Sequence, residues 1–296
     1  MTGTVLITGG GSTVGTHLAH LLSAANIPVL FGSRSGKRIP SSFPSVKLSW
    51  DDPSTFSNPF DWASSKSDTT IKTVYLIAHM DGVDLSGTLI PFIDLAVEKG
   101  VKRFVYLSAS SVDKEHNVAG MGSVPIYLEE KGLDRYILRP TWFIDNLHHT
   151  YGHGIREKGE IETVVPTRRI PFVAAEDIAR AAFEGIVADE NKVKEVIIIG
   201  PELLSYDELA ATTSTILSKP ITHKPISAGE MIKFYSHALP PDVAHGLTQA
   251  ELAIESAGTE ERWASLSTEE QEKMGLKVFV GKTSVKEWVE RNKGLF

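Results

Sequence analysis

Residues 4–15 read TVLITGGGSTVG, an apolar run that breaks into glycines. Residues 5–7 have the pattern of a short buried strand. Residues 15–24 follow with leucines at helical spacing on one face, and a second apolar run covers residues 27–31. The sequence therefore predicts a strand–helix–strand unit with a glycine turn where the helix begins.

The glycine turn is suited to binding a dinucleotide. Glycine lets the backbone turn sharply and lets a pyrophosphate approach the bare N–H groups at a helix N-terminus. The spacing fits G-x-G-x-x-x-G, or G-x-x-S-x-x-G with a serine hydroxyl that can bond a phosphate. A tight turn without a ligand is the alternative. The residues predicted to hold the pyrophosphate are Gly9, Gly11, Ser12, Thr13, Val14 and Gly15.

The end of the second apolar run indicates which dinucleotide binds. An NAD site places an acidic residue there for the ribose hydroxyls. Residues 31–38 read FGSRSGKR and contain neither Asp nor Glu. Cations and hydroxyls suit a 2′-phosphate, so we expect NADPH or NADP⁺, held by Ser33, Arg34, Ser35 and Lys37. A solvated basic loop is the alternative.

The composition excludes several classes of protein. The chain has 296 residues, a net charge of −7 and no cysteine, so disulfides and thiol nucleophiles are excluded. No apolar run reaches transmembrane length, and the N-terminus enters the first strand directly. We expect a cytoplasmic protein with no nucleic-acid or membrane partner and leave its oligomeric state open.

Strand and helix patterns alternate through the first half, which predicts an α/β fold with a doubly wound parallel sheet of the Rossmann type. The further strands expected are 46–48, 73–78, 103–108, 136–138, 170–173 and, as the last, 196–199. Helices are expected at 89–99, 126–131 and from residue 178 after the first-turn acid Asp177. From residue 203 the patterns are mainly helical, with a Ser205–Glu208 capping box and helices at 228–237, 250–255, 269–274 and 284–291.

These patterns predict two domains. Residues 1–145 form the dinucleotide-binding domain, to which residues 170–200 return. Residues 146–169 and 201–296 form a smaller, mainly helical substrate lobe. Met231, Phe234 and Tyr235 are candidates to line its pocket, whereas we assign Trp263 and Trp288 to the core.

Several stretches together resemble one family. The chain is similar to the NmrA-like atypical short-chain dehydrogenases and, among them, to the fungal ergot-alkaloid reductases of the festuclavine and agroclavine dehydrogenase group. The most specific stretches are LRPTWF at residues 138–143 and GPELLSYDELA at residues 200–210. The others are residues 4–11, 94–112, 119–133, 136–146 and 171–183.

The resemblance implies a Rossmann domain that binds NADPH and a C-terminal substrate lobe. It also implies action on an imine or iminium centre of a small indole-alkaloid substrate. Because ligands of doubly wound folds bind beyond the carboxyl ends of the strands, we expect further cofactor contacts there. The residues expected to make them are Ala78, His79, Ser108, Pro140, Trp142 and Phe143.

The sequence offers two candidate positions for the residue that donates the catalytic proton. Tyr127 and Lys131 match the Tyr-x-x-x-Lys pair of short-chain dehydrogenases, but they lie too near residues 136–138 for that pair. The alternative is that Tyr127 packs its helix onto the sheet. Glu115 and His116, in the loop after residues 103–108, are candidates for a proton relay, with a solvated polar loop as the alternative.

An iminium substrate changes what the site needs. Hydride can reach a cationic carbon without a general acid, so the pocket needs an aromatic or anionic wall. The candidates for this wall are Asp81, Trp142, Phe143, Asn146 and Tyr151. His148 and His149 are adjacent in the sequence, but no third metal-ligating residue stands at a suitable spacing from them, so no metal site is expected.

Three functions follow from these patterns. The first is NADPH-dependent reduction of a C=N centre in fungal indole-alkaloid biosynthesis. The second is a redox-assisted cyclase of the Diels–Alder type that uses NADP(H). The third is an NmrA-like sensor that binds NADP(H) without turnover, which the loss of the Tyr-x-x-x-Lys pair would favour.

Overall fold

The computed structural model describes residues 3–67, 69–78, 84–112 and 120–296. The chain divides into two compact units. The first unit comprises Met1–Arg139 and Ile178–Val196, and the second comprises Pro140–Asp177 and Ile197–Phe296. The functional roles predicted for the two domains stay predictions.

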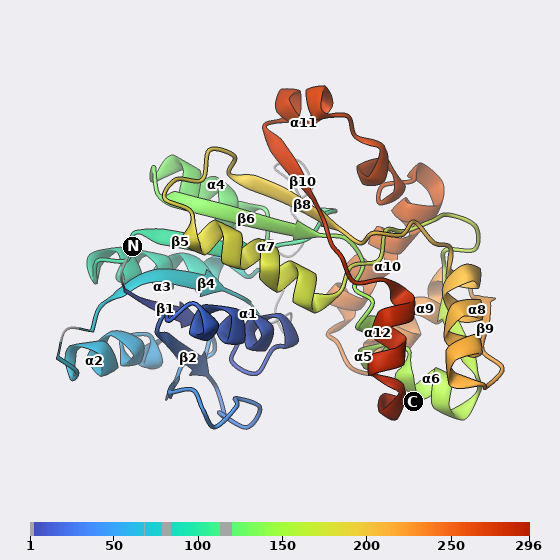
Figure 1. Ribbon diagram of the computed structural model, residues 1–296, viewed down its shortest axis with the longest axis horizontal. Helices are drawn as coiled ribbons and strands as arrows, with labels where there is room; N and C mark the ends of the chain where they lie inside the picture. The colour runs from blue at the N-terminus through green and yellow to red at the C-terminus, as the bar shows by residue number, and fades with distance from the viewer. Residues whose placement is uncertain (1–2, 68, 79–83, 113–119) are drawn as a thin grey trace. The chain divides into compact units, whose positions relative to one another are not determined.

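An eight-stranded sheet is the centre of the fold (Figure 1). Its strand order is β10-β8-β6-β5-β4-β1-β2-β3, and the neighbours from β3 to β6 pair in parallel. The predicted doubly wound Rossmann-type fold is therefore confirmed. The strands are β1 (Thr4–Ile7), β2 (Val29–Ser33), β3 (Ser45–Lys47), β4 (Ile71–Leu76), β5 (Arg103–Leu107), β6 (Asp134–Pro140), β8 (Glu195–Ile199) and β10 (Leu276–Val280).

Helices cover both faces of the first unit's strands. One face packs against α2 (Asn58–Ser64), α3 (Ser86–Glu98) and α4 (Ser123–Glu130) in one continuous apolar cluster. The opposite face carries α1 (Thr13–Ala24) and α7 (Ala175–Val187). Gly185 allows this close approach of α7, because a Cβ there would lie 2.1 Å from the Tyr136 ring of β6.

A buried arginine fixes the C-terminal end of α7. Arg103, only 1% exposed, pairs with Asp134 at 2.6 Å. Its guanidinium also donates to the carbonyls of Gly185, Ile186 and Asp189. Gly185 and Ile186 lie in the last turn of α7, where carbonyls lack intrahelical partners, and Asp189 follows the helix, so the arginine satisfies the end of α7 and complements the helix dipole.

The second unit is mainly helical, as predicted for the C-terminal lobe. A two-stranded parallel sheet of β7 (Glu160–Thr163) and β9 (Thr222–Pro225) accompanies the helices. Trp263 and Trp288 are buried in its cores, as expected. The helices are α5 (Asn146–His149), α6 (Gly152–Glu157), α8 (Tyr206–Leu217), α9 (Ala228–Ser236), α10 (Pro241–Ala257), α11 (Thr268–Met274) and α12 (Val285–Arg291).

Two sequence-based strand predictions are wrong. Residues 170–173 form no strand, because Ile170 bridges to Leu204 and Val173 to Phe143 within loops. Residues 196–199 are not the last strand, since β10 extends the sheet beyond them. The helix expected at 250–255 is longer and begins at Pro241. No helix in the described part of the chain is both long and apolar enough to span a membrane.

Candidate functional site

The glycine turn lies between β1 and α1 in the first unit. Gly9 and Gly11 have φ values of +64° and +87°, a region that favours glycine. A Cβ on Gly11 would lie 2.5 Å from the Cβ of Arg38, so the loop after β2 passes close to this turn. The backbone conformation and the close approach both explain why glycine stands at position 11.

The N-terminus of α1 faces this turn with the polarity that an anion requires. Ser12 is the N-cap, and its hydroxyl accepts a hydrogen bond from the Gly15 N–H at 3.1 Å. The first turn of α1 contains no acidic residue. The positive end of the helix dipole is therefore not neutralised by a carboxylate of its own first turn. Of the other predicted contacts, Val14 is buried and Thr13 begins the helix.

Hydrogen bonds join the glycine turn to the loop after β2. The Gly10 N–H donates to the Gly32 carbonyl at 2.9 Å. The Ser33 hydroxyl accepts from the Gly36 N–H at 3.1 Å and donates to the Gly10 carbonyl at 3.4 Å. Ser33 thus holds the shape of the loop, and its predicted phosphate contact stays a prediction.

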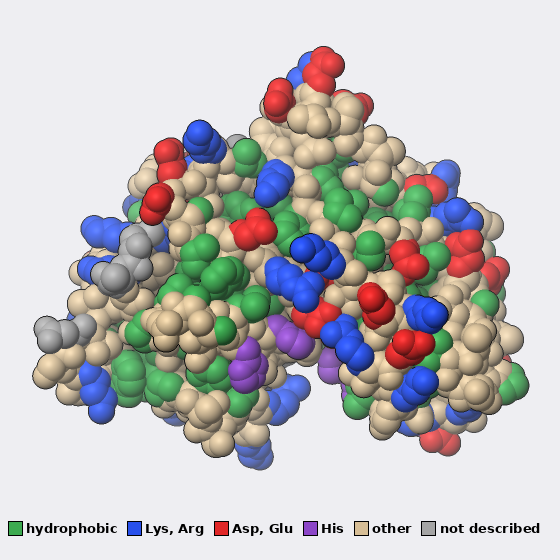
Figure 2. Space-filling view, in the orientation of Figure 1, with side chains coloured by type: hydrophobic (Ala, Val, Ile, Leu, Met, Phe, Trp, Pro, Cys, Tyr) green, Lys and Arg blue, Asp and Glu red, His purple; other side chains and the backbone are tan. Residues whose placement is uncertain are grey.

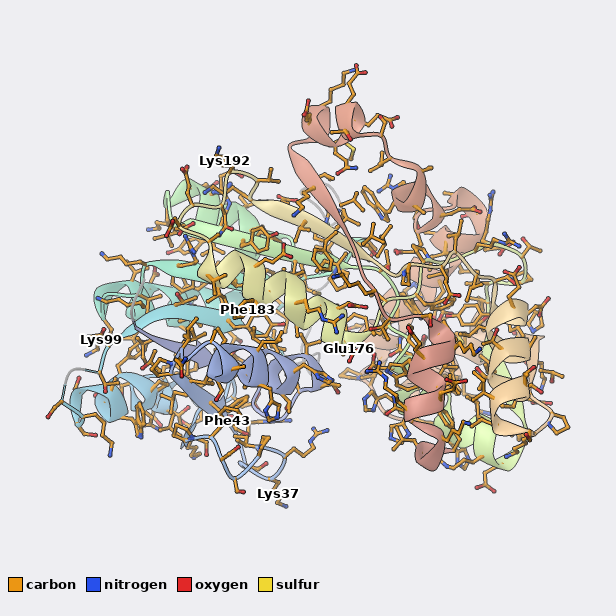
Figure 3. All side chains as sticks on the ribbon, viewed as in Figure 1. Lys37, Phe43, Lys99, Glu176, Phe183 and Lys192 are labelled. Atoms are coloured by element: carbon orange, nitrogen blue, oxygen red, sulfur yellow. The ribbon has the colours of Figure 1, made fainter. Side chains whose placement is uncertain are left out.

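The same loop presents cations to solvent. Arg34, Lys37 and Arg38 are exposed, and Figure 2 shows lysine and arginine side chains on the surface there. Arg34 lies 3.9 Å from Asp51 with both side chains more than half exposed, which is a weak ion pair. Figure 3 shows Lys37 on the part of this loop that projects away from the sheet. The loop therefore carries the charge that a 2′-phosphate requires.

The end of β4 is held beside the end of β1. The Thr8 hydroxyl accepts from the Ile77 N–H at 2.8 Å, and the Trp50 indole N–H donates to the Ile77 carbonyl at 3.2 Å. The next residue, Ala78, is half-buried. After β5, the Ser108 hydroxyl is buried and has no hydrogen-bond partner among the described residues. Both positions are where sequence analysis expects the cofactor.

Four predicted site residues lie outside the described residues: His79, Asp81, Glu115 and His116. Tyr127 is described and lies on α4. Its hydroxyl donates to Asp94, and this bond is the main reason that its pKa is raised. A Tyr-x-x-x-Lys pair needs a lowered pKa, so Tyr127 has no step in the function proposed below. Its ring packs against the cluster beneath α4.

The second unit contains a buried cluster of three phenols around one carboxylate. Glu251, on α10, accepts hydrogen bonds at Oε1 from the Tyr235 hydroxyl at 2.8 Å and the Tyr151 hydroxyl at 3.4 Å. The hydroxyls of Tyr151 and Tyr206 lie 3.1 Å apart. Burial raises the pKa of Glu251 to about 7, while Tyr235, the Val164 backbone N–H and Tyr151 oppose this rise.

The cluster brings together part of the predicted substrate wall. The half-buried Trp142 and Phe234 pack against the apolar cluster that contains Tyr151. Tyr235 and Met231 share a neighbouring cluster, which Phe234 also contacts. Asn146 begins α5, and neither Asn146 nor Phe143 belongs to these two apolar clusters. Phe143 bridges to Val173, and Pro140 ends β6. These assignments stay predictions.

Sequence analysis missed Glu251 and Tyr206. Glu251 lies in the helical stretch AELAIESA, where a single acid resembles the solvated residues of any amphipathic helix. Its burial depends on tyrosines that are 16 and 100 residues away along the chain. Within the described residues, no group of three or more His, Cys, Asp or Glu side chains is placed to hold a metal ion.

The chain is similar to curated proteins in sequence and to solved structures in fold. Festuclavine synthase II of Penicillium roqueforti is 36% identical over 262 residues, which cover 87% of this chain and 90% of that protein. Agroclavine dehydrogenase of Claviceps fusiformis is 33% identical over 279 residues, which cover 92% of each. The solved structure of Citrobacter sp. triphenylmethane reductase complexed with NADP(H) has a TM-score of 0.70 at 17% identity, covering 97% of this chain and 99% of that one. No family model matches the chain.

Proposed function

Because this chain belongs to the fungal festuclavine and agroclavine dehydrogenase family, and is thus an oxidoreductase of alkaloid biosynthesis, we propose that it uses NADPH to reduce an imine or iminium bond. The substrate is a small indole alkaloid. The fold supports this proposal, since a reductase crystallised with NADP(H) shares it.

One structural observation supports NADPH as the cofactor. The glycine turn and the basic loop form one hydrogen-bonded assembly through Ser33 and Gly10, so a pyrophosphate and a 2′-phosphate have adjacent places. The helix N-terminus of α1 and the glycine backbone suit the pyrophosphate. Arg34 and Lys37 suit the 2′-phosphate because charge-assisted hydrogen bonds to phosphate are strong. The residues present therefore fit NADPH.

When bound, NADPH supplies the hydride. The chain's own residues bind and orient: Ser12 and the glycine turn fix the position of the phosphates, and the close pairing of Thr8 with Ile77 keeps the strand ends rigid. An iminium carbon accepts hydride without prior protonation, and an imine that solvent has already protonated does the same, so no titrating tyrosine is required. This agrees with the environment of Tyr127, whose pKa is raised.

The two alternative functions receive no comparable support. Six curated relatives that are 33–37% identical are named as festuclavine synthases or as festuclavine or agroclavine dehydrogenases, and none of these six names describes a cyclase or a regulator of transcription. The aromatic residues of the second unit suit a reductase and a cyclase equally. Reduction is therefore the function that we propose.

Replacing both loop cations tests the cofactor assignment. In an Arg34→Ala/Lys37→Ala double variant, we expect the KM for NADPH to rise about tenfold or more, because each lost charge-assisted bond to phosphate costs on the order of 1 kcal/mol. The KM for NADH should stay within about twofold, since NADH has no 2′-phosphate. Both constants would be measured by the loss of nicotinamide absorbance with an alkaloid imine.

Lys99 provides a matched control. It is exposed and directly follows α3, away from the loop after β2 (Figure 3). Lys99→Ala removes one lysine charge, as Lys37→Ala does within the double variant, and should leave both constants unchanged. Equal changes for NADPH and NADH in the double variant, or the same rise in Lys99→Ala, would show that the loop does not select the cofactor.

A further inference from the structure

We propose that Glu251 is the counter-ion for a cationic nitrogen of the substrate, held in an aromatic site that Tyr151, Tyr235 and Phe234 form in the second unit. This inference rests on the proposed function, because an alkaloid amine or iminium supplies the cation. The ligand class is an organic monocation attached to an indole ring. The inference adds a specificity-determining residue that sequence analysis did not indicate.

The first observation is that one carboxylate oxygen has no hydrogen-bond partner. Oε1 of Glu251 accepts two phenolic hydrogen bonds, from Tyr235 and Tyr151. Oε2 is fully buried and has no hydrogen-bond partner among the described residues, although the backbone N–H of Val164 lies close enough to the carboxylate to oppose the rise of its pKa. A buried carboxylate left in this state is costly unless a donor or a cation satisfies it. The arrangement is therefore completed by a positively charged group.

The second observation is that no described residue supplies a cation to Glu251. The described groups that act on Glu251 are the phenols of Tyr235 and Tyr151 and the backbone of Val164. Tyr206 hydrogen-bonds to Tyr151, and the charge of Glu251 helps to raise the pKa of Tyr206. His223 lies against the Tyr206 ring, but its two nitrogens are engaged by Thr163 and Asp207.

The third observation is the aromatic surround. The Tyr151 ring stacks with Phe234 at 6.5 Å and meets Tyr206 edge-on at 5.9 Å. Phe234 in turn meets Tyr235 at 5.6 Å. Aromatic faces attract ammonium groups, and the attraction strengthens when the cation is desolvated. Phenols, a phenyl ring and a carboxylate therefore combine the two features that recognise an organic cation.

Burial also gives this site a measurable signature. The pKa of Glu251 is raised to about 7, so the free protein holds a proton on this carboxyl at pH 6. A cation placed beside it favours the charged form and expels that proton. Binding of a cation at pH 6 should therefore release close to one proton per molecule bound, whereas binding at pH 9 should release none.

The test uses a probe that cannot be reduced. The probe is N,N,N-trimethyltryptammonium, a permanent cation on an indole, and its uncharged isostere is 3-(3,3-dimethylbutyl)indole. Binding of each to the full chain would be measured by calorimetry at pH 6 and pH 9. Buffers of different ionisation enthalpy would give the number of protons released. We expect proton release at pH 6 for the cation only.

The variant Glu251→Gln should lower the affinity for the cation at pH 9 about tenfold or more and abolish proton release at pH 6, while binding of the isostere is unchanged. Asp242→Asn is the matched control, because Asp242 is an exposed acid on the same helix, and it should bind like the natural chain. Equal cation affinity in Glu251→Gln and the natural chain would overturn the proposal. If Glu251→Gln does not fold, the natural chain is sufficient for the test: a cation that binds at pH 6 without proton release would overturn the counter-ion proposal.

The outcome separates this inference from the proposed function. Turnover of NADPH with an alkaloid imine, together with cation binding that is independent of Glu251, would refute only the counter-ion. Cation binding that depends on Glu251, without any turnover of NADPH, would refute the reductase and leave the cation site standing.

Discussion

Single residues gain their properties from contacts that are distant in sequence. Glu251 is an ordinary helical acid in the sequence, yet it is wholly buried, and phenols from two other segments donate to it. Its pKa is raised because desolvation outweighs these hydrogen bonds. The consequence is a dependence of stability on pH.

The free energy of unfolding should fall as Glu251 becomes ionised. The folded-state pKa, about 7, exceeds the ordinary value of 4.5, so the folded protein binds more protons between these values. The contribution of Glu251 to the free energy of unfolding is therefore greatest below about pH 4.5 and is lost as the pH rises to about 7. The total loss is on the order of 3 kcal/mol.

Glu251→Gln should remove this dependence. Relative to the natural chain, the variant should become more stable by on the order of 3 kcal/mol between pH 4 and pH 8. Urea unfolding of both proteins at the two pH values measures the difference, and Asp242→Asn serves as the control. A stability difference that is the same at pH 4 and pH 8 would contradict the buried, proton-holding carboxyl.

Whether the role of a residue can be predicted from sequence depends on whether its contacts are local or distant along the chain. Gly9 and Gly11 could be placed in a turn from sequence because their backbone conformation is a local requirement. The exposed cations Arg34 and Lys37 could also be predicted, because they come directly after the strand β2 in the sequence. Glu251 could not be found in this way, since its burial depends on Tyr151 and Tyr235, which come from segments that meet only in the folded chain.

Helices and strands differ in how well their sequences indicate them. The capping box of Ser205 and Glu208 is a local signal, and the structure confirms it at the start of α8. Strand β9 has the sequence THKP, whose polar residues and proline do not resemble a strand. It exists because it pairs with β7, about sixty residues earlier in the chain. Pairing over such distances is not visible in local patterns.

The capping box should contribute measurably to stability. The Ser205 hydroxyl accepts from the Glu208 N–H, and the Glu208 carboxylate accepts from the Ser205 N–H at 2.8 Å. Ser205→Ala should lower the free energy of unfolding by about 1 kcal/mol. Ser256→Ala, which changes an exposed serine near the end of α10, should cost less than about 0.5 kcal/mol.

Chemical denaturation of the two serine variants gives both values. An equal cost at the two positions would mean that the capping bonds add nothing to the stability of α8. Thermal melts at the same pH would serve as a second measure, because a loss of about 1 kcal/mol lowers the Tm of a chain of this size by a few degrees.

At the scale of the whole molecule, sequence patterns were sufficient for the architecture. Alternating strands and helices in the first half predicted the doubly wound sheet, and the helical second half predicted the lobe. The edge strand β10 cannot be found from local patterns, because 76 residues of mainly helical chain separate it from β8, the strand beside which it lies. Membership of the alkaloid dehydrogenase family then gives the architecture its chemistry.

The central claim is that a hydride passes from NADPH to the carbon of a C=N bond. The most direct test incubates the protein with an indole-alkaloid imine and NADPH deuterated at the transferable position of the nicotinamide, followed by mass spectrometry of the product. We predict a reduced amine that carries one deuterium on the former C=N carbon. A product without deuterium, or an imine that is recovered unchanged, would contradict the claim.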